Sequence, residues 1–230
     1  MKTSATYETV LNECLQICQK HISKAVRIQP DIDNIYSNLI ISKEEFALQS
    51  RYLHRGFYCP SPDIEYIVTN MRRGRIAKRV DARTQPTNRY LFDDSGKLRL
   101  AETYYPNGAV KREYIFQDKN LVFGFTVDEC DHISEISVAQ YADGIILSCL
   151  WAHCMYCTDN HTYTPWRIIY EKYNYDGASH LETDFYNITP NRFGSYDKYR
   201  FHLDAEGKII KNTIEHVTRE RFETTEKVVF

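Results

Sequence analysis

The residues best suited to metal chemistry lie in one short segment of the chain. Cys154 and Cys157 are separated by two residues, and three residues separate Cys157 from His161. Two thiolates and an imidazole can bind Zn²⁺ tetrahedrally, with His153, Cys149 or a distant residue as the fourth ligand. No second Cys-x-x-Cys and no His-x-x-x-His completes the ligand set. We therefore favour small buried cysteines in a core strand. A zinc-binding module or enzyme centred on Cys154, Cys157 and His161 is kept as an alternative.

Other catalytic signatures are missing from the sequence. A redox Cys-x-x-Cys should open a helix directly after a strand, and the sequence does not indicate that context here. The chain contains no GxSxG, HExxH, P-loop or GxGxxG motif. We therefore assign no catalytic, cofactor-binding or metal-ligating residue, and we expect a protein that is not an enzyme and has no cofactor.

Aromatic residues are the strongest sign of binding. The chain has 18 Tyr and 11 Phe, and Tyr combines a large rigid contact area with a polar end that suits protein interfaces. Cross-strand packing is expected to account for most of these rings. We predict that partner-binding residues lie near the point where the strand repeat breaks: Trp151, Tyr156, Trp166 and Tyr173.

The N-terminal part of the chain has helical spacing. Apolar residues from Tyr7 to Ala25 recur every three or four positions, which places them on one face of a helix. Pro30 predicts that this helix stops by about Gln29, because the residue before a proline is pushed out of helical geometry.

Two further helices are predicted before residue 75. Ser42 and Glu45 have the spacing of a capping box, which predicts a helix over residues 43–53. An amphipathic stretch after Pro60 predicts another helix that ends at Gly74. A basic run begins in the last turn of this helix: Arg72, Arg73, Arg75, Lys78 and Arg79. Contact with phosphates is one interpretation, but we favour a solvated face, because cations near a helix C-terminus complement its dipole.

Beyond Gly74 the spacing changes to short alternating runs rich in Tyr, Phe, Ile, Val and Thr, which are typical of strands. Turn residues that tolerate positive φ recur every twelve positions, at Gly96, Gly108, Asn120, His132 and Gly144. Twelve is an even number, so each strand keeps its inward positions in phase with those of the next repeat. This pattern predicts an antiparallel meander with one continuous buried face.

These elements predict an α+β fold. We expect a helical subdomain over residues 1–74, packed on a long antiparallel β-meander of about ten strands over residues 75–230. The two parts can form one integrated domain. The segment from Ile145 to Cys157 is apolar on both sides, so we expect its strand to be covered on both faces, with the helical subdomain as one cover.

Composition limits the classes of function. Lys and Arg total 29 against 31 Asp and Glu, and the net charge of −2 gives no general attraction to nucleic acid or to anionic lipid. No segment is apolar enough for a secretory signal or a membrane span. Seven cysteines, an odd number, suggest reduced thiols. We expect a cytoplasmic protein with no membrane partner and no nucleic acid partner.

Two hairpin motifs resemble known repeats. The run from Tyr90 to Leu98 resembles the YD repeat of Rhs-type proteins, and the run from Phe201 to Ile209 is similar but has Leu203 at the second aromatic position. Residues 102–113 resemble the MORN-variant repeat of the YwqK-type proteins, a family described as antitoxin-like. In both motifs an Asp or Asn accepts backbone hydrogen bonds in the turn and a Gly takes positive φ.

The resemblance implies a function in binding. A short protein built from such hairpins resembles the immunity proteins of bacterial toxin systems, which implies a toxin domain as the protein partner and inhibition by steric occlusion. This is an analogy at the level of fold. A third alternative is a structural scaffold whose sheet edge pairs with a second copy of the chain.

Overall fold

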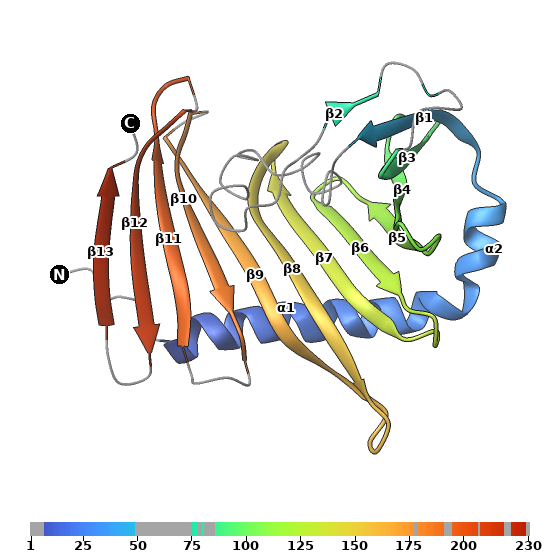
Figure 1. Ribbon diagram of the computed structural model, residues 1–230, viewed down its shortest axis with the longest axis horizontal. Helices are drawn as coiled ribbons and strands as arrows, with labels where there is room; N and C mark the ends of the chain where they lie inside the picture. Colours follow the sequence, from blue (N-terminus) through green and yellow to red (C-terminus); the bar gives the residue numbers. More distant parts are fainter. Residues whose placement is uncertain are drawn as a thin grey trace.

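The computed structural model shows a single large sheet with helices on one face (Figure 1). It describes residues 7–48, 75–77, 80, 86–176, 179–190, 195–206, 208–218 and 222–228. The predicted α+β class, with an N-terminal helix on a long antiparallel meander, is confirmed. The sheet has thirteen strands among these residues rather than about ten.

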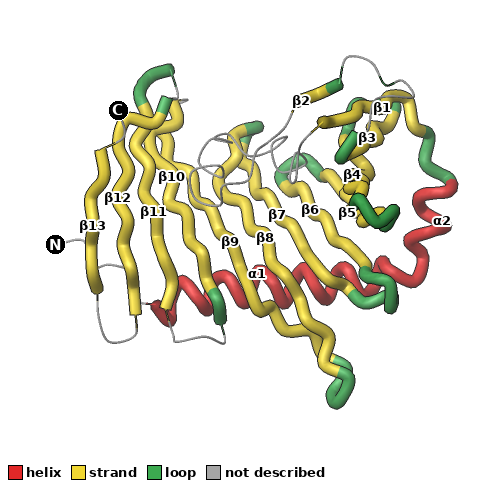
Figure 2. Tube along the Cα trace, viewed as in Figure 1, coloured by secondary structure: helices red, strands yellow, loops and turns green. Residues whose placement is uncertain are grey.

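The first helix follows the predicted apolar stripe. α1 spans Tyr7–Ile28, and its buried residues are Val10, Leu11, Cys14, Cys18, His21, Ile22 and Ala25. A short 3₁₀ turn, Gln29–Asp31, contains Pro30 and leads into α2, Ile32–Ser37. Figure 2 shows α1 crossing the strands as one rod, with α2 continuing toward β3–β5.

The helix predicted over residues 43–53 is wrong where the structure describes it. Residues Ile41–Leu48 form strand β1, which pairs antiparallel with β3. Ser42 does not cap a helix; its Oγ donates a hydrogen bond to the carbonyl of Asp93, 2.6 Å away. Glu45 forms an ion pair with Lys43, two positions away on the same side of the strand. Pairing with β3 thus overrides the local capping signal. The helix predicted after Pro60 lies outside the described residues.

The remaining strands follow the chain in order. They are β2 (Arg75–Ile76), β3 (Asn88–Asp93), β4 (Leu98–Tyr104), β5 (Val110–Gln117), β6 (Leu121–Val127), β7 (Ile133–Ala142), β8 (Ile145–Cys157), β9 (Thr162–Asp176), β10 (Ser179–Ile188), β11 (Ser195–Leu203), β12 (Ile209–Thr218) and β13 (Phe222–Val228). From β3 to β13 each strand pairs antiparallel with its neighbours in sequence, and β1 lies between β3 and β2. The predicted meander is therefore present.

Three hairpin turns share one arrangement centred on an aspartate. Asp93, Asp128 and Asp204 each accept hydrogen bonds on Oδ1 from the backbone N–H groups two and four positions later. Positive φ occurs as predicted at Gly96, Gly108 and Gly144. In the turn before β7, Asp131 rather than His132 has positive φ. The turn chemistry inferred from the two YD-like runs is confirmed at Asp93 and Asp204.

The core under α1 is formed by strands β6 to β10. Cys14 and Cys18 of α1 belong to the same buried cluster as Phe123, Leu150, Cys154, Ile168 and Tyr186. The opposite face of the sheet holds two further buried clusters. β8 contributes to both faces, as predicted, because Leu150 lies under α1 and Trp151 lies in a cluster on the other side. A β-bulge at Leu147 shifts the alternation, so that Ile146 joins Cys149 in one cluster.

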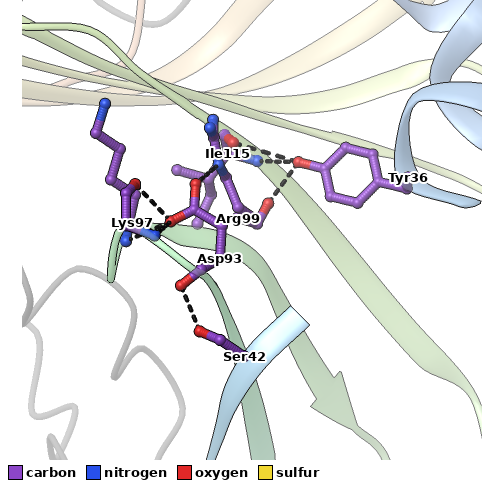
Figure 3. Close-up of polar contacts among 7 residues, drawn as sticks. Tyr36, Ser42, Asp93, Lys97, Arg99 and Ile115 are labelled. Atoms are coloured by element: carbon purple, nitrogen blue, oxygen red, sulfur yellow. Dashed lines mark hydrogen bonds and ion pairs between the residues drawn. The ribbon is translucent and has the colours of Figure 1, made fainter. Parts of the chain in front are cut away.

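Polar contacts fix α2 and β1 to the β3–β4 hairpin (Figure 3). Tyr36 Oη donates to the carbonyl of Arg99 and accepts a hydrogen bond from the N–H of Ile115. Arg99 Nε donates to Asp93 Oδ2 at 2.7 Å. Burial acts to raise the pKa of Asp93, but the hydrogen bonds from Ser95, Lys97 and Arg99 hold it well below its usual range.

Among the helices that the structure describes, none has the length and apolar character required to cross a membrane.

Candidate functional site

The β8–β9 hairpin extends beyond its neighbours. β8 pairs with β7 only as far as His153, and β9 pairs with β10 only from Ile168 onward. Residues 154–167 therefore form a two-stranded ribbon, held by pairing between β8 and β9 alone among the described strands. We call this ribbon the arm. Figure 1 shows it projecting past α1 at the lower edge of the sheet.

A groove of about 640 Å³ lies between α1 and the arm. Its lining residues are Leu15, Gln19, Ile22, Ser23, Val26 and Arg27 from α1, and His161, Thr162, Tyr163, Thr164 and Pro165 from the arm. Successive residues of a strand point to opposite faces of a sheet. Lining by consecutive residues of β9 therefore indicates that the groove follows the edge of this strand rather than one face.

The groove has apolar walls and a basic rim. Leu15, Ile22 and Val26 form the wall on α1, whereas Arg27 is the one lining residue among Asp, Glu, Lys and Arg. Arg27 is exposed, and its Nε donates to the carbonyl of Ser23 at 3.1 Å. From Cys14 to Ile28 the helix carries Lys20, Lys24 and Arg27 but no acidic residue. The groove therefore suits an apolar group that carries negative charge.

One side of the arm carries a cluster of rings. Tyr156 Oη forms a hydrogen bond with His161 Nδ1 at 2.7 Å. The Tyr156 ring stacks on His132, with 4.1 Å between ring centroids, and contacts Tyr163. His132 comes from the turn before β7 and His161 has positive φ at the tip of the arm. This cluster fixes the arm to the body of the sheet next to the groove.

The opposite side of the arm carries Trp166. Its indole ring stacks on His153, with 4.8 Å between ring centroids. His153 Nδ1 lies 3.0 Å from Glu135 Oε1, and Lys111 Nζ lies 2.5 Å from the same oxygen. Burial acts to raise the pKa of Glu135, but the hydrogen bond from His153 and the charge of Lys111 leave it lower than usual. The contact with Glu135 thus holds His153 as a platform for Trp166.

The two cysteines of the Cys-x-x-Cys motif do not converge on one point. Cys154 and Cys157 both lie in β8, and their odd separation points the two thiols to opposite faces. Cys154 is buried under α1, and burial, reinforced by the charge of Glu135, raises its pKa to about 12. Across the residues that the structure describes, no group of three or more His, Cys, Asp or Glu could hold a metal ion.

The four predicted partner-binding residues separate into two pairs. Trp151 is only 4% exposed, and Tyr173 is equally buried, with its hydroxyl against Cys149 and Glu171. Neither can contact a partner, because their strand positions face the buried clusters of the sheet. Trp166, at 43% exposed, and the half-buried Tyr156 both lie on the arm.

The residues of α1 that line the groove were missed by sequence reasoning. The apolar stripe of this helix predicts the core face, and Val26 lies outside that stripe. The absence of acidic residues between Cys14 and Ile28 is visible in the sequence and indicates a basic stretch of this helix. The groove itself depends on how far the arm extends, which no local pattern specifies.

No protein-family model matches this chain, and no curated protein matches its sequence. Its function is therefore argued from the arm and the groove.

Proposed function

We propose that the chain is a non-enzymatic protein that binds another protein, with the arm as its contact surface. The observation that carries this proposal is the projection of residues 154–167 beyond the neighbouring strands. The outer edges of a projecting ribbon lack the hydrogen bonds that a neighbouring strand would supply. A contact with a partner compensates for that loss.

The side chains of the arm support the same proposal. Trp166 and Met155 are exposed on the arm, and Val26 is exposed on the facing helix. Trp and Tyr dominate binding energy at protein interfaces, and Met is enriched there. The contact between His153 and Glu135 holds the stacked Trp166 ring in place before binding, which lowers the entropy cost of ordering it.

The more specific role is that of an immunity protein that neutralises a bacterial toxin domain in the cytoplasm by covering its active site. This role rests on the resemblance of the hairpin runs at residues 90–98 and 102–113 to YD and antitoxin-like repeats. Occlusion needs only a rigid surface and no reactive group, which agrees with an arm held by packed rings.

The proposal is tested by capture followed by a growth assay. Tagged protein is captured gently from its own host under reducing conditions, and native mass spectrometry gives the mass of any second polypeptide, metal or oligomer. The captured polypeptide is then produced in cells with and without this chain. We expect growth arrest without the chain and growth with it. A captured partner that does not arrest growth overturns the immunity role, and a bound zinc ion overturns the metal-free assignment.

A matched pair of variants tests the arm. Trp166→Ala removes an exposed ring from the arm, and Tyr105→Ala removes a similarly exposed ring from the β4–β5 turn, at 43% and 45% exposed. We expect Trp166→Ala to weaken the complex at least tenfold and Tyr105→Ala to leave its Kd unchanged. Equal effects would contradict the arm as the contact surface.

A further inference from the structure

We propose that the groove between α1 and the arm binds an extended acidic peptide segment of the partner, which adds to the free edge of β9 as a further strand. This inference rests on the proposed protein-binding function and names the chemistry of the segment that is bound. Strand addition beside a helix lets main-chain hydrogen bonds provide affinity while the side chains of alternate residues enter the groove.

The free edge of β9 is the first observation. Among the described strands, residues 162–167 pair with β8 on one side and with nothing on the other, because the pairing of β10 ends at Ile188 opposite Ile168. Pro165 lacks an N–H group, so this edge cannot form a long ladder with a second copy of the chain. The residues before Pro165 remain available to a short incoming strand.

The length of the groove is the second observation. Its lining positions on α1 run from Leu15 to Arg27 and keep to one side of the helix over about three turns. α1 crosses the strands, so the length of an added strand is set by the free edge of β9 at residues 162–167. An extended chain rises about 3.3 Å per residue, so this edge is roughly 20 Å long and roughly six peptide residues can pair with it.

The charge and the walls of the groove define the peptide. Leu15, Ile22 and Val26 suit apolar side chains at alternate peptide positions. Arg27 lies on the rim, and its Nε donates a hydrogen bond to the carbonyl of Ser23. A guanidinium recognises a carboxylate with two parallel hydrogen bonds. We therefore assign an acidic residue, or a terminal carboxylate, to the peptide position opposite Arg27.

The test uses a library of random octapeptides displayed on phage and the full-length chain. Selection on the wild-type chain is followed by depletion on Val26→Glu, which places a charge on the apolar wall. Val110→Glu on β5 is the matched control, because the two valines are 43% and 37% exposed. We expect enrichment of sequences with alternating apolar residues and an acidic residue toward one end. Absence of such a shared pattern overturns the proposal.

A synthetic peptide of the selected sequence then separates strand addition from simple side-chain docking. N-methylation at alternate backbone positions removes ladder donors without changing the side chains. We expect it to weaken binding at least tenfold in one of the two alternating registers. Arg27→Glu should weaken binding at least fivefold, and Val110→Glu should leave it unchanged. Binding that tolerates N-methylation in both registers overturns strand addition.

The growth assay distinguishes failure of this inference from failure of the proposed function. If Val26→Glu loses the peptide but still protects cells from the partner, the groove is not the inhibitory surface and the immunity role stands. If the wild-type chain binds the peptide but its captured partner arrests no growth, the immunity role fails and the groove remains a peptide site.

Discussion

The hydroxyl of Tyr36 occupies the place of a ladder hydrogen bond beside Ile115. The pairing between β4 and β5 ends at Leu100 opposite Tyr114, so Arg99 and Ile115 are the next residues along the two strands. Tyr36 Oη accepts from Ile115 N at 2.8 Å and donates to the carbonyl of Arg99. One side chain from α2 thus closes the gap where two strands separate.

Removing this hydroxyl tests its contribution. Tyr36→Phe leaves the N–H of Ile115 and the carbonyl of Arg99 without this partner, which is expected to cost about 1–3 kcal/mol of unfolding free energy. Urea denaturation at equilibrium gives the value. Tyr105→Phe is the control, because Tyr105 is exposed. Equal stabilities of the two variants would show that water replaces the hydroxyl at no cost.

Acid unfolding tests the turn aspartate. The pKa of Asp93 is lower in the folded chain than its ordinary value of 3.8, so its ionised form stabilises the fold above that value. This stabilisation is lost as the pH falls below about 4. We expect Asp93→Asn to reduce the dependence of unfolding free energy on pH between about pH 4 and pH 2, measured by urea titration at each pH. The pKa of Glu135 is also lowered, so the unfolding free energy of the variant should still depend on pH, but less steeply. An unchanged slope would contradict the hydrogen-bonded arrangement of Asp93.

Gly124 in β6 leaves room for a buried hydrogen bond between β5 and β7, the two strands that flank β6. Ser137 donates to Glu113 Oε1 across this position, and a Cβ added to Gly124 would lie 2.5 Å from both of those oxygen atoms. We expect Gly124→Ala to destabilise the fold by about 1–3 kcal/mol through overpacking. Thermal unfolding measures the loss, and Ser137→Ala in the Gly124→Ala background should recover part of it. If the double variant is no more stable than Gly124→Ala, the contact with Ser137 is not the source of the destabilisation.

Thiol reactivity tests how the cysteines are distributed. Burial raises the pKa of Cys14 and of Cys154 to about 12 and raises that of Cys18 further, and only the thiolate is reactive. Cys130 is exposed and Cys157 is half-buried. With a thiol reagent at pH 8, mass spectrometry of digested protein should show modification at Cys130 first and Cys157 next among the six cysteines that the structure describes. Modification of Cys154 in the folded protein would contradict its place under α1.

The turns show what could be predicted from sequence. Asp93, Gly96 and Gly108 act through contacts within a few residues, so local spacing was enough to identify them. Ser42 shows the opposite case. Its spacing with Glu45 is a valid helix signal, but its hydroxyl bonds to Asp93, 51 positions away. Pairing between distant segments decides the structure there, and a local pattern contains no information about it.

The candidate site also combines features that the sequence predicts with features that depend on long-range packing. Partner binding was predicted for four aromatic residues between positions 151 and 173, and two of them, Tyr156 and Trp166, lie on the arm. Trp151 and Tyr173 were misplaced, because the alternation of a strand gives two faces without saying which of them is covered. The groove needed the register of β9 against β10, which ends at Ile168.

The order of elements along the chain also sets the order in which they leave the ribosome. α1 is made before every strand that the structure describes, yet Glu13 on this helix accepts a hydrogen bond from Tyr170, 157 positions later. Its apolar stripe has no surface to pack on until β6 to β9 have been synthesised. The nascent chain therefore carries an exposed amphipathic helix through most of its synthesis, and this helix is where chaperones would protect the unfinished protein from aggregation.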